Sequence, residues 1–265
     1  MRRQIASGGW IEYDDVGRGR PVVLLHAFPL SRLMWRPQIE ELSKDYRLVT
    51  PDFPGFGGSG ASHGAPSIAA MADAVAGLLD ALQISQPVVL AGLSMGGYAA
   101  LAFARQYPAR LRGLVLADTK AGADTAEGKS NRDKMIAFAQ EHTAEEVFEQ
   151  LLSKLVSEET RTHRPAVVTE LRRIAAAQPT KAIRAALQAL RDRPDATPWL
   201  RDIRVPTLVI VGSDDGLTPP GVAQALVDRI PDARLTTLSG AGHLSNLEQP
   251  ELFNLALCGF LDKVS

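Results

Sequence analysis

The chain has 265 residues, enough to bury one large core, and its 29 Lys plus Arg against 30 Asp plus Glu give a formal net charge of −1 at pH 7. Because the two signs are interspersed, the composition excludes a basic field for nucleic acid and a basic amphipathic segment for a membrane surface, and it favours a small neutral or mildly charged ligand. The single cysteine, Cys258, cannot form an intrachain disulfide and is compatible with a reducing compartment.

The N-terminal residues lack the apolar core of a signal peptide, and no apolar run approaches membrane-spanning length. We therefore expect a cytoplasmic protein without a membrane partner. The same region predicts a β-hairpin, with strands at residues 4–6 and 10–13 and a turn at residues 7–9. We expect this hairpin to cover one edge of a sheet.

Residues 21–26 form an apolar run typical of a buried strand, and residues 26–29 form a Pro-containing loop before a helix predicted over residues 31–42. Ligand contacts in an α/β sheet lie at the carboxyl ends of the strands. If this loop lies beside the serine turn described below, the amide of Phe28 can act as an oxyanion donor. We interpret His26 as a structural histidine that braces the loop, because the donor required is a backbone amide.

A strand is predicted over residues 47–50, and the glycines in residues 55–60 match the pattern Gly-x-Gly-x-x-Gly. That pattern suggests a dinucleotide site, but Pro54 precedes the glycines, and residues 61–66 stand where the phosphate-binding helix should begin. We therefore predict a tight surface loop and no nucleotide. Residues 67–82 carry apolar residues at three- and four-residue spacing, which predicts a helix packed on the sheet.

The most informative stretch is a buried strand at residues 88–93 that runs into an Ala/Leu-rich helix. Ser94 lies in the sharp turn between them, flanked by Gly92 and Gly96 in the pattern Gly-x-Ser-x-Gly. The glycines permit a positive φ at the serine and a close approach of strand and helix. The helix that starts near Met95 directs unpaired amides toward the serine, so an anion formed there would meet hydrogen-bond donors.

A strand at residues 111–117 is followed by a region without strand patterns, residues 123–198, which reads as consecutive helices. We predict a helical cap laid over the carboxyl edge of the sheet, so that residues 1–122 and 199–265 form the core. An independent helical domain that binds a partner is the alternative. Lys120, at the entrance to this region, is a candidate to hold a substrate carboxylate, the alternative being an exposed loop lysine.

The sheet is predicted to resume at residues 206–211, which are followed directly by Asp214 and Asp215. One of this pair is expected to serve only turn formation and helix capping. After a last strand at residues 234–238, His243 lies in a Gly-rich loop before a final helix. The chain therefore places serine, aspartate and histidine, in that order, after different strands of one sheet, which is the triad order of this architecture.

These segments together resemble the α/β-hydrolase superfamily over essentially the whole chain. The matching motifs are His26-Ala-Phe-Pro29, Asp52-x-Pro-Gly-x-Gly, Gly92-Leu-Ser-Met-Gly-Gly97, Gly212-x-x-Asp215-x-x-Thr-Pro219 and Gly242-His243. The chain looks most like the small cofactor-free members, which include carboxylesterases, 3-oxoadipate enol-lactonases and the serine haloperoxidase (perhydrolase) group. The resemblance implies an α/β fold with a mostly parallel eight-stranded sheet flanked by helices, and a helical cap inserted after strand 6.

The resemblance also implies a role for each site residue. Ser94 would be the nucleophile, His243 the general base and acid, and Asp215 the residue that orients His243. Asp215 is preferred to Asp214 because the family's spacing counts three residues from Gly212. Met95 and Phe28 would donate the oxyanion-hole amides. The chain departs from the family at Ala27, where glycine is common, and the extra methyl narrows that loop.

The predicted function is hydrolysis of small to medium carboxylic esters or lactones through an acyl-enzyme, with no cofactor and no metal. The histidines at positions 63, 142 and 163 are scattered without ligand spacing. Two alternatives stay open. The same triad could serve carbon–carbon bond hydrolysis, perhydrolysis or thioester hydrolysis, or the chain could be a non-catalytic ligand-binding protein. The expected partner is a small-molecule substrate, without nucleic acid, and a homo-oligomer is left open.

Overall fold

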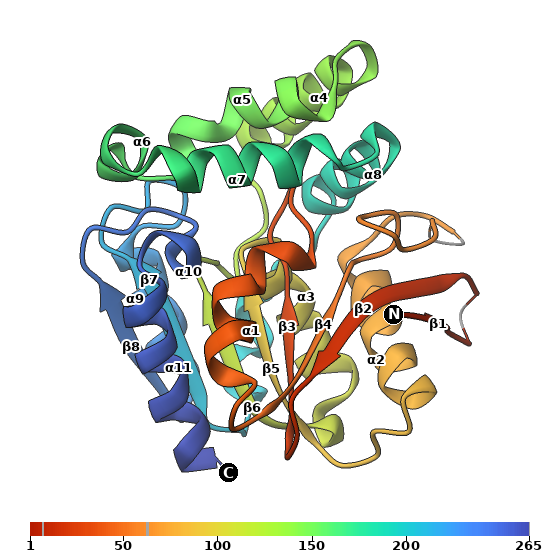
Figure 1. The fold of residues 1–265 in the computed structure, drawn as a ribbon, viewed down its shortest axis with the longest axis vertical. Coiled ribbons are helices and arrows are strands. Elements are labelled where there is room, and N and C mark those ends of the chain that lie inside the picture. Colours follow the sequence, from red (N-terminus) through yellow and green to blue (C-terminus); the bar gives the residue numbers. More distant parts are fainter. Residues whose placement is uncertain (7, 62–63, 265) are drawn as a thin grey trace.

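A computed structural model describes residues 1–6, 8–61 and 64–264, so Ser7 of the predicted turn and His63 lie outside the described residues. Within these residues one sheet holds eight strands in the order β1-β2-β4-β3-β5-β6-β7-β8 (Figure 1). The strands are β1 (Arg2–Gln4), β2 (Trp10–Val16), β3 (Pro21–Leu25), β4 (Arg47–Pro51), β5 (Val88–Leu93), β6 (Leu111–Ala117), β7 (Thr207–Gly212) and β8 (Ala233–Leu238).

Six strands, from β4 through β8 in the sheet order, run parallel, and β1 and β2 pair antiparallel at one edge. The central strands β3, β5 and β7 are buried along their whole lengths, which explains their continuous apolar sequences. Parallel strands all end at the same edge of the sheet, so the loops after β3, β5, β6, β7 and β8 gather there. This is the predicted mostly parallel eight-stranded α/β fold.

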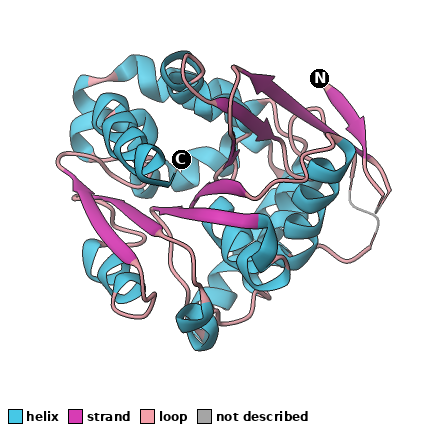
Figure 2. Ribbon diagram, turned by 90° about the horizontal axis from the view of Figure 1, so that it is seen from below, coloured by secondary structure: helices cyan, strands magenta, loops and turns pink. Residues whose placement is uncertain are grey.

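Helices cover both faces of the sheet, as the view from below shows (Figure 2). Apolar residues of α1 and α11 pack with one set of strand side chains, and those of α2, α3 and α9 pack with the other. Alternate strand residues point to opposite faces, so each face has its own core cluster. The helices are α1 (Arg36–Leu42), α2 (Ile68–Ala81), α3 (Met95–Gln106), α9 (Pro220–Val227), α10 (Ser245–Glu248) and α11 (Pro250–Val264).

The edge hairpin differs in detail from its prediction. Strand β1 ends at Gln4 because Ile5 closes the turn, with its amide donating to Gly9 O and its carbonyl accepting from Gly8 N. Strand β2 continues to Val16 because it pairs with β4 over that length. A local turn therefore set the end of β1, whereas pairing with a distant strand set the end of β2.

Between β6 and β7 the described chain contains no strand, and helices α4–α8, here called the helical insert, lie across the carboxyl ends of the strands (Figure 1). Thr143 and Glu146 form a capping box at the start of the second of these helices. The first helix starts at Ala126 because Thr125 caps it by accepting from Gly128 N. The helices are α4 (Ala126–Glu141), α5 (Ala144–Leu155), α6 (Glu158–His163), α7 (Pro165–Ala176) and α8 (Thr180–Arg191).

Short helical turns complete the fold, and the turn at Arg32–Trp35 together with α1 spans the helix predicted over residues 31–42. One of them, α10, directly follows the loop of His243, and the others are 3₁₀ helices at Arg32–Trp35, Pro108–Arg110 and Thr197–Asp202. Over the part of the chain that the structure describes, we find no helix with the length and apolar character needed to span a membrane.

Candidate active site

Ser94 lies in the turn from β5 into α3 and has φ 55° and ψ −111°. A positive φ is costly for a residue with a Cβ, and such strain persists only where surrounding structure enforces it. The close contacts around the turn do this. A Cβ on Gly92 would lie 2.1 Å from Gly96 O, and a Cβ on Gly96 would lie 2.2 Å from Leu25 O. Glycine is therefore required at both positions, and the serine is held at the end of a packed strand.

His243 lies in the loop after β8 and connects the other two predicted residues. Its Nε2 is 2.8 Å from Ser94 Oγ, and its Nδ1 is 2.8 Å from Asp215 Oδ2. His243 and Asp215 are 3% and 2% exposed. Residues separated by up to 149 positions thus form one continuous hydrogen-bonded chain. With Nδ1–H donated to the carboxylate, Nε2 is left to accept the proton of the serine hydroxyl.

The carboxylate of Asp215 is fixed by the turn that follows it. Oδ1 accepts from Leu217 N at 2.8 Å and Thr218 N at 2.9 Å, and Oδ2 accepts from Thr218 Oγ1 at 2.6 Å. Burial alone would raise the pKa of Asp215, but its bond to His243, the charge of that residue and the Thr218 bonds outweigh burial and lower the pKa. Asp215 is therefore ionised at neutral pH. Asp214 is exposed and accepts from Ser213 Oγ.

The two amides predicted to bind an oxyanion are those of Met95, at the first turn of α3, and Phe28, in the loop after β3. Among the described residues neither amide donates to a backbone or side-chain acceptor. The Phe28 loop is shaped by a cis peptide bond before Pro29 and by a bond from Leu30 N to Ala27 O. Ala27 is fully buried, so the methyl group that departs from the family pattern is accommodated within the core.

His26 braces this loop from below. Its Nδ1 lies 3.0 Å from Ala27 O, and its Nε2 accepts from Phe53 N at 3.0 Å, which joins the loops after β3 and β4. The ring also contacts the rings of Phe53 and Phe56. Burial lowers the pKa of His26 to about 4, so the ring is neutral and both nitrogens serve these bonds. His26 is part of the support of the loop, as its sequence context suggested.

Sequence analysis missed two buried residues, Asp118 and Thr119, which directly follow β6. Thr119 Oγ1 donates to Ser94 O at 2.9 Å, and Asp118 Oδ1 accepts from Gly212 N at 2.9 Å. A carboxylate after a buried strand was a usable signal, since the same reasoning singled out Asp215. The sequence around Asp118 differs from that around Asp215 because the residues after it lead directly into the helical insert.

Lys120 has no hydrogen bond or ion pair to the Ser94, Asp215 and His243 chain within the described ranges. Its Nζ lies 3.7 Å from Asp124 Oδ1, in a network with Arg132 of α4 (3.1 Å) and Arg193 (2.8 Å). Burial and the neighbouring Arg193 lower the pKa of Lys120. Arg193 stacks over the ring of Tyr98, 4.3 Å from its centroid, in the first turns of α3. The network therefore joins the two ends of the helical insert beside the helix that follows Ser94.

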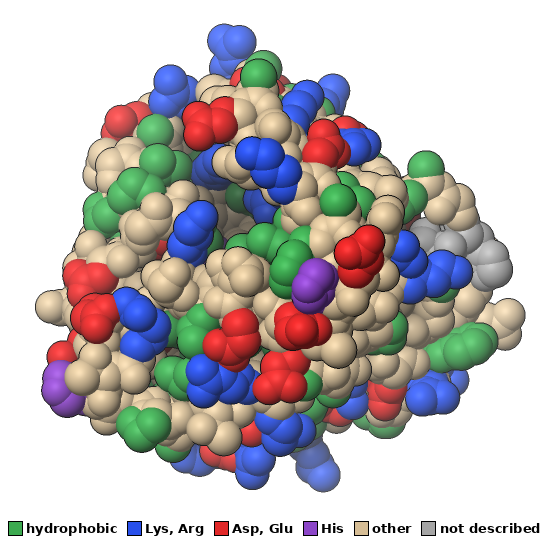
Figure 3. Space-filling view, turned by 90° about the horizontal axis from the view of Figure 1, so that it is seen from above, with side chains coloured by type: hydrophobic (Ala, Val, Ile, Leu, Met, Phe, Trp, Pro, Cys, Tyr) green, Lys and Arg blue, Asp and Glu red, His purple; other side chains and the backbone are tan. Residues whose placement is uncertain are grey.

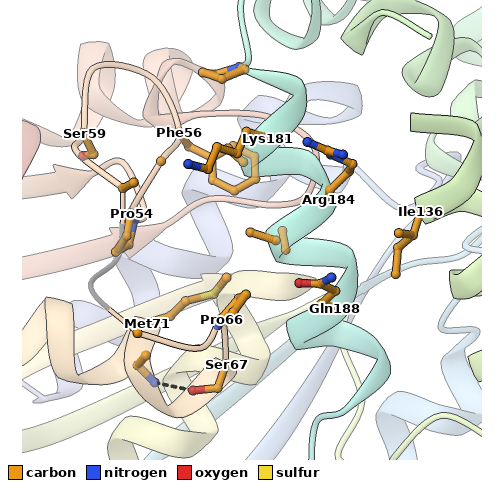
Figure 4. Close-up of a pocket in the computed structure, with 18 of the residues that line it drawn as sticks. Pro54, Phe56, Ser59, Pro66, Ser67, Met71, Ile136, Lys181, Arg184 and Gln188 are labelled. Atoms are coloured by element: carbon orange, nitrogen blue, oxygen red, sulfur yellow. Dashed lines mark hydrogen bonds between the residues drawn. The ribbon is translucent and has the colours of Figure 1, made fainter. Parts of the chain in front are cut away.

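A cavity of about 630 Å³ lies between α8, α4 and the segment from Pro54 to Met71 (Figure 4). Its lining combines apolar residues such as Phe56 with Lys181 and Arg184, but it does not include Ser94, Asp215 or His243. The site is therefore assigned by hydrogen-bond geometry rather than by cavity size. Seen from above, the helical insert carries intermingled acidic and basic side chains (Figure 3). Among the described residues no three or more His, Cys, Asp and Glu side chains are grouped as a metal site.

Comparisons with known proteins agree with this arrangement. The family model for the α/β-hydrolase fold matches residues 20–250. The solved structure of a thermophilic esterase from Thermogutta terrifontis is 37% identical, with a TM-score of 0.96 over 100% of this chain and 98% of that chain. The 2-hydroxy-6-oxo-2,4-heptadienoate hydrolase of Pseudomonas putida is 31% identical over 98% of this chain and 95% of its own length. The 3-oxoadipate enol-lactonase 2 of Acinetobacter baylyi is 29% identical over 93% and 91%, respectively.

Proposed function

This chain belongs to the α/β-hydrolase family, and from that premise we propose that it is a serine hydrolase that cleaves carboxylic esters or lactones of small to medium size. The observation that chiefly supports the proposal is the buried chain of hydrogen bonds from Ser94 through His243 to Asp215. Esterase and enol-lactonase relatives of nearly the same length support the choice of substrate class.

In the proposed mechanism, His243 Nε2 takes the proton of Ser94 as Oγ attacks the substrate carbonyl carbon. The carbonyl π electrons move to oxygen and give a tetrahedral oxyanion. Collapse of this intermediate breaks the bond to the leaving alcohol oxygen, which takes its proton from His243. Water then attacks the acyl-enzyme with the same proton transfers, releases the acid and restores the serine. Asp215 keeps the imidazole in one tautomer and stabilises its positive charge.

The amides of Phe28 and Met95 are proposed to bind the oxyanion. Both lack an acceptor within the described part of the protein, and Met95 opens a helix of twelve residues whose N-terminus favours negative charge. By analogy with a side-chain donor in another oxyanion hole, each donor would contribute roughly 10²- to 10³-fold in kcat. In a lactone, the leaving oxygen stays attached to the acyl group, so the acyl-enzyme carries a free hydroxyl.

We assign residues 1–122 and 199–265 to a catalytic core and residues 123–198 to a cap. Helices α4–α8 lie across the strand ends where the site is built, so their apolar residues are proposed to wall the substrate pocket. Lys120 is proposed to attract a carboxylate on the distal end of a substrate. It is half-buried, and the cluster it shares with Arg132 and Arg193 has one carboxylate, that of Asp124, for three cations.

Turnover of a p-nitrophenyl short-chain ester tests the proposal directly. Wild-type protein should release p-nitrophenol with burst or steady-state kinetics, and Ser94→Ala should abolish this turnover. A serine-directed phosphonate should inactivate the protein, and mass spectrometry should place the label on the peptide that contains Ser94. Absence of turnover and of labelling would instead favour a ligand-binding protein on this scaffold.

Hydrolysis of a carbon–carbon bond is the second candidate, favoured by the similarity to the dienoate hydrolase of Pseudomonas putida. The same triad would then act on a ring-cleaved aromatic dienoate or a β-diketone. A panel of esters, lactones, β-diketones and dienoates, each measured with and without the phosphonate, separates the two. The primary proposal requires kcat/KM for an ester or lactone to exceed that for the carbon–carbon substrates.

A further inference from the structure

The segments that carry Ser94, Asp215 and His243, here called the three arms, converge on the dipeptide Asp118–Thr119, which directly follows β6. The carboxyl of Asp118 contacts the arm of Asp215 through Gly212 N, at 2.9 Å, and the arm of His243 through the hydroxyl of Ser245. Thr119 Oγ1 donates to Ser94 O at 2.9 Å. Ser94 lies in the turn after β5, Gly212 ends β7, and Ser245 opens α10 after the His243 loop, so one dipeptide joins segments that follow three different strands.

The backbone at Asp118 is adapted to this position. Its φ is 44°, which is unfavourable for most side chains and tolerated best by Gly, Asn and Asp. Its amide donates to Ile210 O at 2.9 Å, which continues the pairing of β6 with β7 past the last regular ladder residue. The side chain is thereby turned between the two loops that follow β7 and β8.

The carboxyl of Asp118 is fully buried, without a cation that pairs with it among the described residues. Its hydrogen-bond partners are Gly212 N and Ser245 Oγ, and the charged groups that act on it are the carboxylates of Asp215 and Glu248. Burial and the nearby Asp215 raise the pKa of Asp118 well above its ordinary value.

We propose that Asp118 is a positioning residue that, as a neutral carboxylic acid, fixes the loops of Asp215 and His243 relative to each other, while Thr119 fixes the loop of Ser94. In this form Oδ1 accepts from Gly212 N–H, and the protonated Oδ2 donates to Ser245 Oγ. The loops are joined without a second negative charge beside Asp215. The contacts of Asp118 and Thr119 with the three arms are here called the clasp. The role of the clasp in catalysis rests on the proposed function, whereas the clasp itself does not.

Small displacements of the three arms should lower kcat, because a misplacement of about 1 Å can lower a reaction rate by about 100-fold. Asp118→Asn keeps the acceptor for Gly212 N and provides an amide donor for Ser245 Oγ. It therefore imitates the neutral acid. Asp118→Ala removes both contacts, and Ser245→Ala removes only one. Asp214→Asn, an exposed position after the same strand as Asp215, is the matched control.

The test measures kcat, KM and the pH profile of kcat/KM for p-nitrophenyl acetate in these variants. We expect a decrease in kcat of about 10- to 100-fold in Asp118→Ala, a smaller decrease in Ser245→Ala and no more than about threefold in Asp118→Asn, with KM changed little. The acidic limb of the profile should keep its apparent pKa in Asp118→Asn. A shift of that limb to lower pH would mean that a negative charge had been removed beside the histidine, and would overturn the neutral-acid assignment.

A second readout separates this proposal from the proposed function. The low-field proton resonance of His243 Nδ1–H reports the bond to Asp215 whether or not the protein turns over an ester. We expect this resonance to persist in Asp118→Asn and to shift or broaden in Ser245→Ala, with circular dichroism checking the fold. An unchanged resonance in Ser245→Ala and Asp118→Ala would overturn the clasp, and absence of ester turnover with a resonance that responds as expected would overturn only the function.

Discussion

The carboxyl edge of the sheet, with the loops that carry Ser94, Asp215 and His243, is here called the rim. The rim and the helical insert that lies across it are stabilised by different contacts. At the rim, the arms of Ser94, Asp215 and His243 are joined to one another by buried hydrogen bonds between side chains and backbone. The helical insert joins the molecule mostly through apolar packing, with residues such as Phe148 and Ile183 belonging to the two core clusters of the sheet. The difference shows that buried hydrogen bonds fix the relative positions of Ser94, Asp215 and His243, whereas apolar packing mainly holds the insert.

Polar contacts between the helical insert and the rest of the molecule qualify that separation. At one end of the helical insert, the fully buried Glu248 accepts from Ser157 N and Thr160 Oγ1, both at 2.8 Å, and from Leu244 N, next to His243, at 3.2 Å. Asp124, which precedes α4, pairs with Arg132 of α4 and with Arg193, which follows α8. The insert therefore contacts the histidine loop through the carboxylate of Glu248 and through the backbone bond from Leu244 N to Leu155 O, at 3.0 Å.

The largest effect is expected within the rim, at Asp215. Asp215→Asn should lower kcat by about 10⁴-fold, the loss seen for the same change in another triad, because the amide favours the wrong imidazole tautomer. Asp214→Asn should change kcat little, since that side chain is exposed. Steady-state kinetics on one ester measure both variants. The reverse result would assign the role of the acid to Asp214. If Asp215→Asn kept its activity and the double variant Asp215→Asn with Asp118→Asn lost it, Asp118 would be shown to replace Asp215.

A smaller effect is expected where the two regions meet. Glu248→Gln replaces one acceptor oxygen with a donor, which leaves a buried amide or hydroxyl unpaired and should lower the free energy of unfolding by up to about 3 kcal/mol. Urea denaturation measures this change, and kcat should fall because Leu244 follows His243, the proposed general base. Glu251→Gln, at an exposed site on α11, is the control. Equal stabilities of the two variants would mean that the Glu248 carboxylate does not stabilise the contact between the insert and the histidine loop.

The free energy of unfolding should depend on pH through His26, which supports the loop of Phe28. His26 has a pKa lowered from 6.5 to about 4 in the folded state, so its contribution to stability is complete above pH 6.5 and is lost as the pH falls toward 4. At pH 5 the loss should be about 2 kcal/mol. His26→Gln lacks this group, so its free energy of unfolding should fall less between pH 7.5 and pH 5. Parallel pH dependence in both proteins would contradict a neutral, buried His26.

The smallest effect is expected at the entrance to the helical insert. Lys120→Met should lower kcat/KM about three- to tenfold for an ester with a distal carboxylate, since a half-exposed charge contributes modestly, and change it less than twofold for a neutral ester. Lys134→Met, on the exposed side of α4, should alter neither. Equal losses on the two esters would remove Lys120 as a carboxylate site and leave substrate choice to the apolar residues of the insert.

Several features of this protein could be predicted from sequence because they depend on local physics. Apolar runs locate the buried strands, the glycines around Ser94 are required by close backbone approach at one turn, and the cap of α5 follows from Thr143 and Glu146. The parallel sheet follows from alternating strands and helices, and it brings the ends of strands to one edge. These regularities suffice for the fold and for the candidate residues Ser94, Asp215 and His243.

Only the tertiary structure decided which atoms meet at that edge. The 2.8 Å separations around His243 depend on the lengths and registers of three loops, and the choice between Asp214 and Asp215 depends on which side chain turns inward. Glu248 carries no local signature, because it acts through a partner 91 residues away, and the position of Asp118 after a buried strand does not reveal its partner 94 residues away. Sequence patterns record how each segment folds, whereas contacts between distant segments arise only when the whole core has packed.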